Sequence, residues 1–261
     1  VGRCVHLVSS GLHATHAHAI EPSMTTRKLS IAEISERFPE FRVAAAHVVL
    51  DPSWSVDAER LATEIARREG DARALWSGVD LSAIPGVAAW RSAYKLFGIK
   101  KTSYRSSVER LIKRVQAGDS LPQINPLVDL YNAVSLTHGK KKKNKKHNKT
   151  NGDLAFRFSR SGDTFLDMGA AQGDDPNDPP KAGEVVYADE GHVLCRRWNW
   201  RQDARSAVAP QTRHAIVPIQ ANGWGDLDAA VADFSNWAEA ALGARSCVHI
   251  ADRERQVVEI G

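Results

Sequence analysis

The chain has 261 residues, of which 43% are hydrophobic and 25% are charged, and its formal net charge is +4 at pH 7. This is the composition of an ordinary soluble globular protein that can bury a substantial core, as one large domain or two small ones. No apolar run approaches the roughly 20 residues of a membrane helix, and residues 1–23 lack the layout of a secretory signal. We therefore expect a cytoplasmic protein with no membrane partner.

The positive charge is concentrated in one segment. Residues 140–149 hold seven lysines, and without them the formal net charge would fall to −3. A block of like charges this dense is typical of a solvated loop, so we expect residues 139–151 to be disordered. Alternatively, the lysines add a nonspecific, salt-sensitive attraction for RNA, because they displace counterions from phosphates.

The first predicted element follows a flexible N-terminal extension. Residues 1–23 carry four histidines, which can chelate metal weakly, but they show no apolar periodicity. An extension without such a pattern is expected to be poorly ordered. Ser30 and Glu33 then have the spacing of a capping box, which predicts a short helix that ends before Pro39.

Apolar periodicity predicts the next elements. Residues 41–50 are largely apolar and predict a strand, and residues 57–69 predict an amphipathic helix that ends at Gly70. Residues 85–97 predict a further helix. Its aromatic residues Trp90, Tyr94 and Phe97 lie along one face, which favours a core position over ligand contact.

Two capping signals predict the following pair of helices. Ser106 and Glu109 form a second capping box ahead of an apolar-periodic stretch. Asn125 can cap a helix whose first residue is Pro126, a position that tolerates proline. The polar residues within this last helix are Asp129, Tyr131 and Asn132.

Beyond the lysine-rich segment the pattern becomes strand-like, with alternating apolar residues and turn signals. The expected elements are a strand at 154–158, a hairpin of 184–188 and 192–198, a strand at 214–219, a helix at 227–242 that ends at Gly243, and strands at 247–250 and 256–260. Residues 172–182, rich in Asp and Pro, predict a surface loop. No repeat or linker is visible, so we expect one α+β domain over residues 24–261.

Common catalytic and cofactor motifs are absent from the sequence. It contains no G-x-G-x-x-G, no P-loop, no H-E-x-x-H, no C-x-x-C and no G-x-S-x-G motif, so we expect no metal and no cofactor. Cys4, Cys195 and Cys247 are far apart and fit free thiols. Cys195 has His192 and His214 as potential partners of a nucleophile, but its apolar strand favours a core position.

The segment that follows the predicted hairpin has the densest ligand-binding chemistry. Guanidiniums suit phosphate or carboxylate, indoles suit a flat ring, and amides suit hydrogen-bonding edges. The alternative interpretation is a strand edge with both tryptophans in the core and the arginines in water. The candidate residues are Arg196, Arg197, Trp198, Asn199, Trp200, Arg201 and Gln202.

Two motifs resemble the B3/B4 domain of the phenylalanyl-tRNA synthetase beta subunit. Residues 122–136 read P-Q-I-N-P-L-V-D-L-Y-N-A-V-S-L, where the family has R-P-I-N-x-V-V-D-x-T-N-Y-V. Residues 183–189 read G-E-V-V-Y-A-D, where the family has a strand that ends in A-D. The layout over residues 90–234 is similar to free-standing members of this family, which carry V-D-L-Y-N and C-R-R-W-N-W-R-Q forms.

The resemblance implies a mixed sheet curled toward a barrel, with helices packed on one side and a core at about residues 85–245. It also implies an editing activity, the hydrolysis of the ester between a wrong amino acid and the 3′ end of tRNA. Asn132 matches the family's pocket asparagine, and Asp129 matches an aspartate that fixes the loop. The family's pocket histidine falls at Lys143 and its tyrosine-recognising glutamate falls near Pro218, so tyrosine specificity is not carried over.

We therefore expect a trans-editing aminoacyl-tRNA deacylase whose partner is the aminoacylated 3′ end of tRNA. Asn132 and Asn199 would hold the α-amino group or the ester carbonyl. Tryptophans would stack on adenine and arginines would contact phosphates. The predicted substrate-binding residues are Arg196, Arg197, Trp198, Trp200, Arg201, Gln202, Asp129 and Tyr131. The alternatives are a non-catalytic tRNA-binding module and an amino-acid or small-ligand sensor.

Overall fold

The computed structural model describes most of the chain. The described residues are 26–51, 53, 56–99, 104–138, 152–171, 173, 175–207 and 212–260. The expected flexible extension over residues 1–23 and the expected disordered loop over residues 139–151 lie outside them. Within these ranges, no helix has both the length and the apolar character to cross a membrane.

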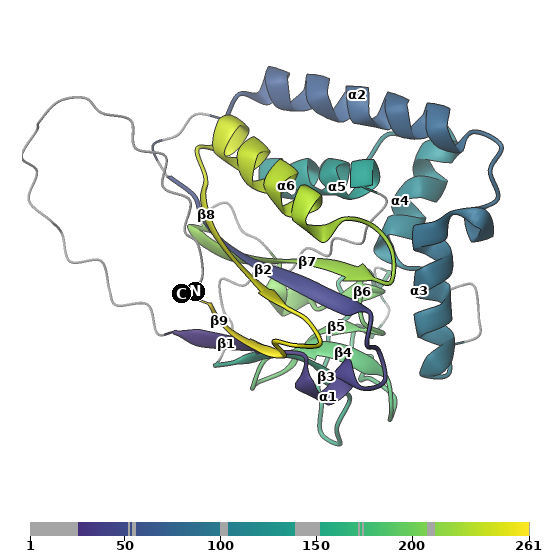
Figure 1. Ribbon diagram of the computed structural model, residues 1–261, viewed down its shortest axis with the longest axis vertical. Helices are drawn as coiled ribbons and strands as arrows, with labels where there is room; N and C mark the ends of the chain where they lie inside the picture. Colours follow the sequence, from purple (N-terminus) through teal and green to yellow (C-terminus); the bar gives the residue numbers. More distant parts are fainter. Residues whose placement is uncertain are drawn as a thin grey trace, which may run out of the picture.

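Two β-sheets lie below a layer of helices (Figure 1). The smaller sheet has the order β7 (His214–Asn222), β2 (Phe41–Val49) and β8 (Arg245–Ala251), and its pairs are antiparallel. The larger sheet has the order β6 (Arg201–Gln202), β5 (Val193–Arg196), β4 (Val185–Ala188), β3 (Leu154–Phe158), β1 (Arg27–Ser30) and β9 (Val257–Ile260). Strands β1 and β3 pair in parallel, and the other neighbours are antiparallel.

In the described part of the chain, five helices pack with one face of the three-stranded sheet in a single hydrophobic core. They are α2 (Ala58–Trp76), α3 (Pro85–Leu96), α4 (Ser107–Gln116), α5 (Pro126–His138) and α6 (Leu227–Leu242). Helix α3 also contributes to the core between the sheets, as does α1 (Ala32–Ser35). The α+β class is therefore confirmed.

The expected curl of the sheet toward a barrel is wrong for the described part of the chain. Strands β2, β7 and β8 pair with one another, while β6 and β9 are the two edges of the six-stranded sheet. The two sheets therefore meet through side chains, as stacked layers do, instead of closing through hydrogen bonds.

Strand β2 forms the boundary between the two cores. Val43 and Ala45 contribute to the core between the sheets, whereas Ala44, Ala46 and Val48 contribute to the core below the helices. Because successive side chains of a strand alternate between its faces, a strand that is buried on both must be apolar throughout. This requirement explains the largely apolar run that predicted the strand, in which Arg42 and His47 are the exceptions.

Helices α4 and α5 begin where their capping residues predict. Ser106 Oγ accepts a hydrogen bond from Glu109 N at 3.2 Å, and Asn125 Oδ1 accepts one from Val128 N at 3.1 Å. Each bond satisfies a backbone donor that has no partner within its own helix. The two helix ends that these caps fix lie beside the candidate site described below.

The capping box predicted at Ser30 and Glu33 is wrong. The carboxylate of Glu33 instead accepts hydrogen bonds from Phe158 N at 3.0 Å and from Arg160 at 2.9 Å, which tie α1 to the end of β3. Ser30 is the last residue of β1, a strand that the sequence analysis did not predict. The glutamate is therefore used for a long-range contact, not for a local cap.

The predicted end of a helix at Gly70 is also wrong, because α2 continues to Trp76. A glycine inside a helix costs about 1 kcal/mol relative to alanine. Ala72 and Trp76, which follow it, are buried in the core below the helices. Burial of one large side chain contributes roughly 1.5–3 kcal/mol, which exceeds the cost of the glycine.

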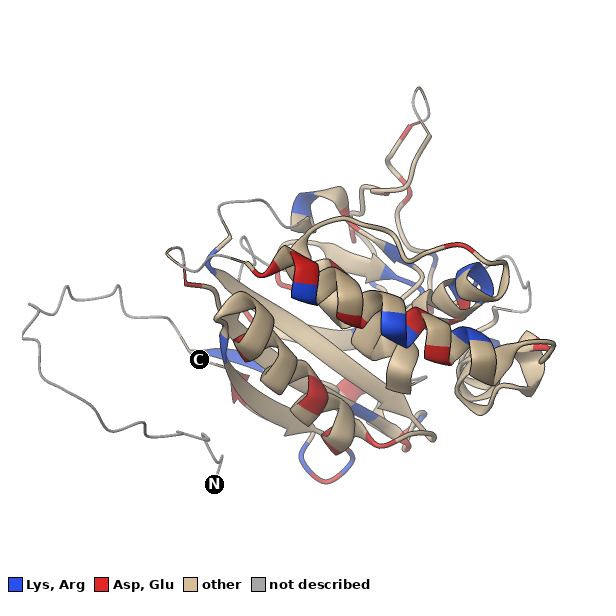
Figure 2. Ribbon diagram, turned by 90° about the horizontal axis from the view of Figure 1, so that it is seen from above, with Lys and Arg blue, Asp and Glu red and all other residues tan. Residues whose placement is uncertain are grey.

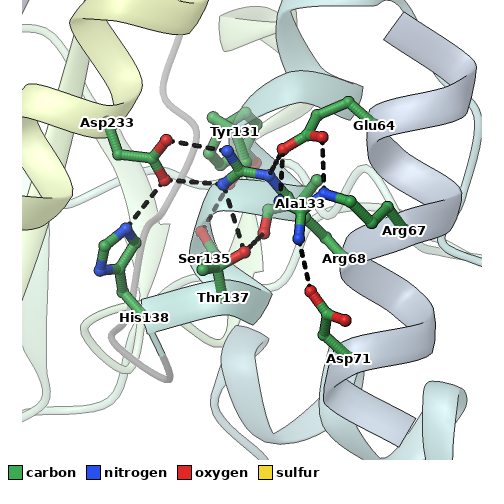
Figure 3. A network of polar contacts seen from close by, with 10 residues as sticks. All are labelled: Glu64, Arg67, Arg68, Asp71, Tyr131, Ala133, Ser135, Thr137, His138 and Asp233. Atoms are coloured by element: carbon green, nitrogen blue, oxygen red, sulfur yellow. Dashed lines mark hydrogen bonds and ion pairs between the residues drawn. The ribbon is translucent and has the colours of Figure 1, made fainter.

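Arg68 joins three helices through one guanidinium (Figure 3). It donates to Glu64 of α2 at 2.7 Å, to Thr137 of α5 at 3.2 Å, and to the two carboxylate oxygens of Asp233 of α6 at 2.6 and 2.8 Å. Asp233 also lies 2.8 Å from His138 Nε2, at the end of α5. The Arg68 side chain is only 8% exposed, so its charge depends on these partners.

The same network lowers the pKa of its carboxyl groups. A hydrogen bond from Arg67 is the main reason that the pKa of Glu64 falls to about 2. Burial opposes the ionisation of Asp233, but hydrogen bonds from Arg68 and His138 outweigh it and lower the pKa of this group as well. Both carboxylates therefore favour the folded state at neutral pH.

We expect Asp233→Asn to lower the free energy of unfolding by about 3 kcal/mol, because it leaves the buried Arg68 charge without its main ion pair. Arg67→Gln is the matched control. Arg67 also contacts Glu64, at 2.7 Å, but its side chain is 56% exposed, and an exposed ion pair contributes at most about 1 kcal/mol. Urea unfolding at pH 7 measures both losses, and equal losses would contradict the role assigned to Arg68.

The lowered pKa values predict a loss of stability in acid. A carboxylate whose pKa is depressed by folding stabilises the protein above its unfolded-state pKa, and this contribution is lost as pH falls toward the folded-state pKa. We therefore expect the free energy of unfolding to decrease from about pH 4.5 down to about pH 2. The difference between the protein and its Asp233→Asn variant should shrink over the lower part of that window. Urea unfolding at several pH values measures this, and a constant difference would contradict it.

Candidate functional site

A cleft of about 480 Å³ lies beside the starts of α4 and α5. Its walls come from one face of α4, from the first half of α5 with the loop before it, and from residues 168–169 and 200–202. We call it the arginine cleft, because Arg110, Arg114 and Arg201 line it. Its other polar and aromatic lining residues are Ser107, Asn125, Tyr131, Asn132, Trp200 and Gln202.

The arginine cleft brings together two motifs that are far apart in the sequence. Tyr131 and Asn132 come from α5, whereas Trp200, Arg201 and Gln202 come from the turn and strand after β5. The structure therefore places the amide of Asn132 in the same cavity as an indole and a guanidinium. These five residues were all predicted as site residues.

Trp198 lies outside the cleft. It is fully buried, and its ring makes edge-to-face contacts with Phe38, Phe41 and Trp90 at centroid distances of 4.6, 4.8 and 5.2 Å. The prediction that Trp198 stacks on a base is therefore wrong, because no part of its ring reaches the surface. Its role is to anchor the turn between β5 and β6.

Asn199 and Arg196 are also fully buried. Asn199 Oδ1 accepts a hydrogen bond from the hydroxyl of Tyr94, on α3. Arg196 Nη2 donates to Glu184 at 2.7 Å, and Nη1 donates to the carbonyl of Asp178 at 2.8 Å. The predictions that Asn199 holds the ester and that Arg196 contacts phosphate are therefore wrong, because both side chains are used inside the fold.

Arg197 supports the wall of the cleft without lining it. Its guanidinium carbon lies 3.8 Å from the ring centroid of Tyr104 and 4.3 Å from that of Trp200, and Nε lies 3.3 Å from Glu184. Burial has the largest effect on the pKa of Arg197 and lowers it, whereas the nearby carboxylate of Glu184 raises it. The side chain is 4% exposed, so direct contact with a phosphate, as predicted, is not supported by this geometry.

The backbone explains why neighbouring residues point in different directions. Arg197 and Trp198 have φ angles of 43° and 63°, in the left-handed region that few non-glycine residues adopt. They begin a tight turn, after which Gln202 pairs with Cys195 and Arg201 with Arg196. The alternation of side chains along β5 therefore ends at the turn.

Arg201 and Gln202 are held in place by neighbouring loops. Arg201 Nη1 pairs with Asp167 at 3.0 Å, and Gln202 Nε2 donates to the carbonyl of Ser206 at 3.0 Å. Gly169 permits the approach of Arg201, because a Cβ atom there would lie 2.0 Å from Nη1. Both side chains remain partly exposed within the cleft.

Asp129 positions the loop that forms one edge of the cleft. Its Oδ1 accepts a hydrogen bond from Ile124 N at 2.8 Å, across the start of α5. Ile124 and Asn125 line the cleft, but Asp129 does not. This contact agrees with the loop-fixing role that the family resemblance implies, whereas the prediction of Asp129 as a substrate-binding residue is not supported, because it lies outside the lining of the cleft.

The electrostatic character of the arginine cleft is positive. Among the residues that the structure describes, its lining contains three arginines and no Asp or Glu. Ser107 is the first residue of α4 and Asn125 precedes the first residue of α5, so the N-terminal ends of two helices border the cavity. A helix N-terminus carries roughly half a positive charge. The cleft is therefore suited to an anionic ligand.

The described lining residues of the cleft include no His and no Cys, the side chains that most often act as general bases near neutral pH. Cys195 is buried in the core between the sheets, as expected. In the described ranges, no group of three or more His, Cys, Asp or Glu is arranged to hold a metal ion. The residues of the cleft can bind, orient and donate hydrogen bonds.

A second cavity, of about 660 Å³, lies between α2 and α6. Arg68, Asp233 and Trp237 are among its lining residues. Its main charged groups already pair with one another in the network around Arg68 (Figure 3). The arginine cleft, where like charges gather without a carboxylate in the lining, is therefore the better candidate for ligand binding.

Three residues of the site were missed by the sequence analysis. Tyr104 stacks on Arg197, and Arg110 and Arg114 line the cleft. The available signal was the amphipathic pattern of α4, whose apolar residues are buried in the core. Arg110 and Arg114 are four residues apart and therefore share the opposite, polar face. That pattern alone does not distinguish a ligand-binding face from a solvated one.

Trp198 and Trp200 differ in their contribution to stability. We expect Trp198→Ala to lower the free energy of unfolding by about 3–5 kcal/mol, because it opens a cavity in the aromatic core. Trp200→Ala is the matched control and should cost about 1 kcal/mol, the scale of its contacts with guanidiniums. Urea unfolding of both variants compares them. A larger loss for Trp200→Ala would show that the anchor of the turn has been assigned to the wrong residue.

The chain was compared with known proteins and protein families. The B3/4 domain model matches residues 89–223, just over half of the chain. The matched region includes Asn132 and Trp200, and thus both walls of the arginine cleft. No curated protein is significantly similar to the chain. Since the family model covers more than half of its length, the chain belongs to the B3/4 domain family.

Proposed function

We propose that the arginine cleft binds the aminoacylated 3′ end of tRNA and that the protein hydrolyses the ester of a mischarged amino acid. The observation that carries this proposal is the lining itself, in which three arginines, an indole, a phenol and three amides gather with no carboxylate among the described lining residues. Aminoacyl-tRNA presents phosphates, a purine and an ester to such a site. The membership of the B3/4 domain family supports the same conclusion.

The parts of this ligand match the parts of the cleft. A volume of about 480 Å³ falls within the roughly 300–1,000 Å³ of small-ligand sites. Arginines bind phosphate oxygens through several donors, and the aromatic side chains of Tyr131 and Trp200 present surface for a base. Leu111 and Val128 provide an apolar wall for the amino-acid side chain.

Ester hydrolysis in this cleft would depend on positioning. Water adds to the ester carbonyl, and the bond between this carbon and the ribose oxygen breaks to release the amino acid and free tRNA. The amide of Asn132 would donate a hydrogen bond to the developing oxyanion. The neighbouring ribose hydroxyl of the substrate would assist the proton transfer, since the described lining residues include no His, Cys, Asp or Glu.

A second candidate function is binding of the tRNA end without hydrolysis. The observation that favours it is that the lining residues within the described ranges include no His, Cys, Asp or Glu. The position that matches the pocket histidine of the family falls at Lys143, which lies outside the described residues. The two functions share the ligand and differ only in turnover.

Substitution of Asn132 by Ala separates the two functions. If the protein is a deacylase, this variant should lose roughly 100-fold in single-turnover hydrolysis while its affinity for tRNA changes little, because the amide acts mainly on the transition state. Hydrolysis of a panel of mischarged tRNAs measures turnover, and filter binding measures affinity. Asn236→Ala, in the cavity between α2 and α6, is the matched control and should leave both unchanged.

The outcomes distinguish the candidates clearly. A rate equal to that of buffer for every tRNA, together with tight tRNA binding, would refute the deacylase and favour the binding module. The absence of both hydrolysis and tRNA binding would refute both candidates. Asn132 is 7% exposed, so the thermal unfolding of the variant must be shown to match that of the protein before rates are compared.

A further inference from the structure

We propose that Arg110 and Arg201 together bind the phosphate on the 5′ side of the terminal adenosine, so that the arginine cleft recognises a 5′-phosphorylated nucleoside. The inference rests on the proposed function only for the identity of the nucleoside. It assigns a specificity-determining role to Arg110, which lies on α4. This helix is outside the two predicted ligand-binding motifs, residues 122–136 and 196–202.

Arg110 is placed to meet an anion. It is the fourth residue of α4, lines the cleft and is exposed to solvent. Within the part of the chain that the structure describes, no carboxylate forms an ion pair with it, whereas Arg91 and Arg105 both pair with Glu109. Its donors are therefore available to a ligand.

The second guanidinium lies close to the first. Loss of hydration in the cleft, followed by the nearby positive charge of Arg201, lowers the pKa of Arg110. An arginine remains protonated at neutral pH despite such a shift, so two like charges face the same cavity. An anion between them would relieve this repulsion and gain hydrogen bonds from both sides.

Arg201 retains donors beyond its ion pair. Its Nη1 pairs with both carboxylate oxygens of Asp167, whereas Nη2 has no hydrogen bond or ion pair among the described residues. The pairing with Asp167 holds the guanidinium at the wall of the cleft. Arg201 therefore presents a fixed guanidinium to the cavity that Arg110 also lines, and a tetrahedral anion has enough oxygens to accept hydrogen bonds from both.

The neighbouring helix ends add to the positive potential. Ser107 at the start of α4 and Asn125 at the start of α5 line the same cavity. The two helices have ten and thirteen residues, so each has several aligned peptide dipoles. A phosphate beside a helix N-terminus is a recurrent arrangement in proteins. The positive potential of the helix ends and the two arginines thus both favour a phosphate group.

The experiment compares adenosine 5′-monophosphate with adenosine by calorimetry. We expect the protein to bind the monophosphate at least about tenfold more tightly, because two charge-assisted contacts are added. Arg110→Gln should remove most of this preference, and Arg110→Lys should retain part of it. Lys113→Gln is the matched control, because Lys113 is an exposed cation of the same helix that does not line the cleft.

A second measurement uses a single-stranded trinucleotide that ends in adenosine. The affinity for this trinucleotide should fall as the salt concentration rises. In Arg110→Gln, the plot of the logarithm of affinity against the logarithm of salt concentration should be shallower by roughly one unit of slope, as expected for loss of one phosphate contact. Arg110 is exposed and has no ion pair to lose, so the variant should unfold at the same temperature as the protein. Lys113→Gln should leave the slope unchanged.

Three results would overturn this inference: equal affinity of the protein for the two small ligands, no measurable binding of either, or an unchanged preference in Arg110→Gln. None of them depends on hydrolysis. If the phosphate preference is found but no tRNA is bound or deacylated, the proposed function fails and the phosphate site stands. If deacylation is found without the preference, the proposed function stands and the role of Arg110 is refuted.

Discussion

The burial of Trp198 is the interaction on which the geometry of the candidate site depends. Arg197 and Trp198 both adopt a left-handed backbone conformation, which costs roughly 1–2 kcal/mol for each non-glycine residue. Burial of a tryptophan removes about 200 Å² from water and contributes roughly 5 kcal/mol, and the edge-to-face contacts with Phe38, Phe41 and Trp90 add to it. The gain exceeds the strain, so the turn is held in this form.

This turn determines which side chains reach a ligand. Once Trp198 is in the core and Asn199 is bonded to Tyr94, the chain reverses and carries Trp200 to Gln202 alongside α5. The opposite wall is held by different interactions. Asn125 caps α5 at the end that borders the cleft, and the network around Arg68 fixes its other end (Figure 3). The two walls therefore depend on separate parts of the core.

The surface around this framework carries charge of both signs. Figure 2, viewed from above the helices, shows blue and red segments interspersed along α2, as expected for an exposed helix face with ion pairs. Such mixed surfaces create little net field. The arginine cleft differs, because its lining gathers one sign of charge without the other. The charge of the cleft lining therefore differs from the mixed charge of the exposed face of α2.

The sequence predicted those parts of the structure that local patterns determine. The apolar run of β2 and the caps Ser106 and Asn125 were sufficient, because burial on two faces and helix capping leave direct traces in the sequence. The end of a helix at Gly70 and the capping role of Glu33 were wrong, because tertiary burial and a contact to β3 override local preference.

The same limit applied within the candidate site. Residues 196–202 were predicted as site residues, and Trp200, Arg201 and Gln202 among them line the cleft. The sequence did not show which of the seven would do so, because the alternation of side chains along a strand does not extend through a left-handed turn. One interpretation assigned both tryptophans to ligand binding and the other assigned both to the core, and neither was correct for both residues. Trp198 is in the core, as the simpler interpretation required, whereas Trp200 lines the cleft. Arg110 was missed because an exposed arginine on an amphipathic helix has no distinctive pattern.

The chemistry of the arginine cleft is consistent with an activated substrate. Without a side-chain base, a site accelerates a reaction by placing its reactants and by stabilising the charge that develops. An aminoacyl ester meets this condition, because its carbonyl is reactive and the adjacent ribose hydroxyl belongs to the substrate. Under the proposed function, the described lining would therefore act by binding and orienting such an ester.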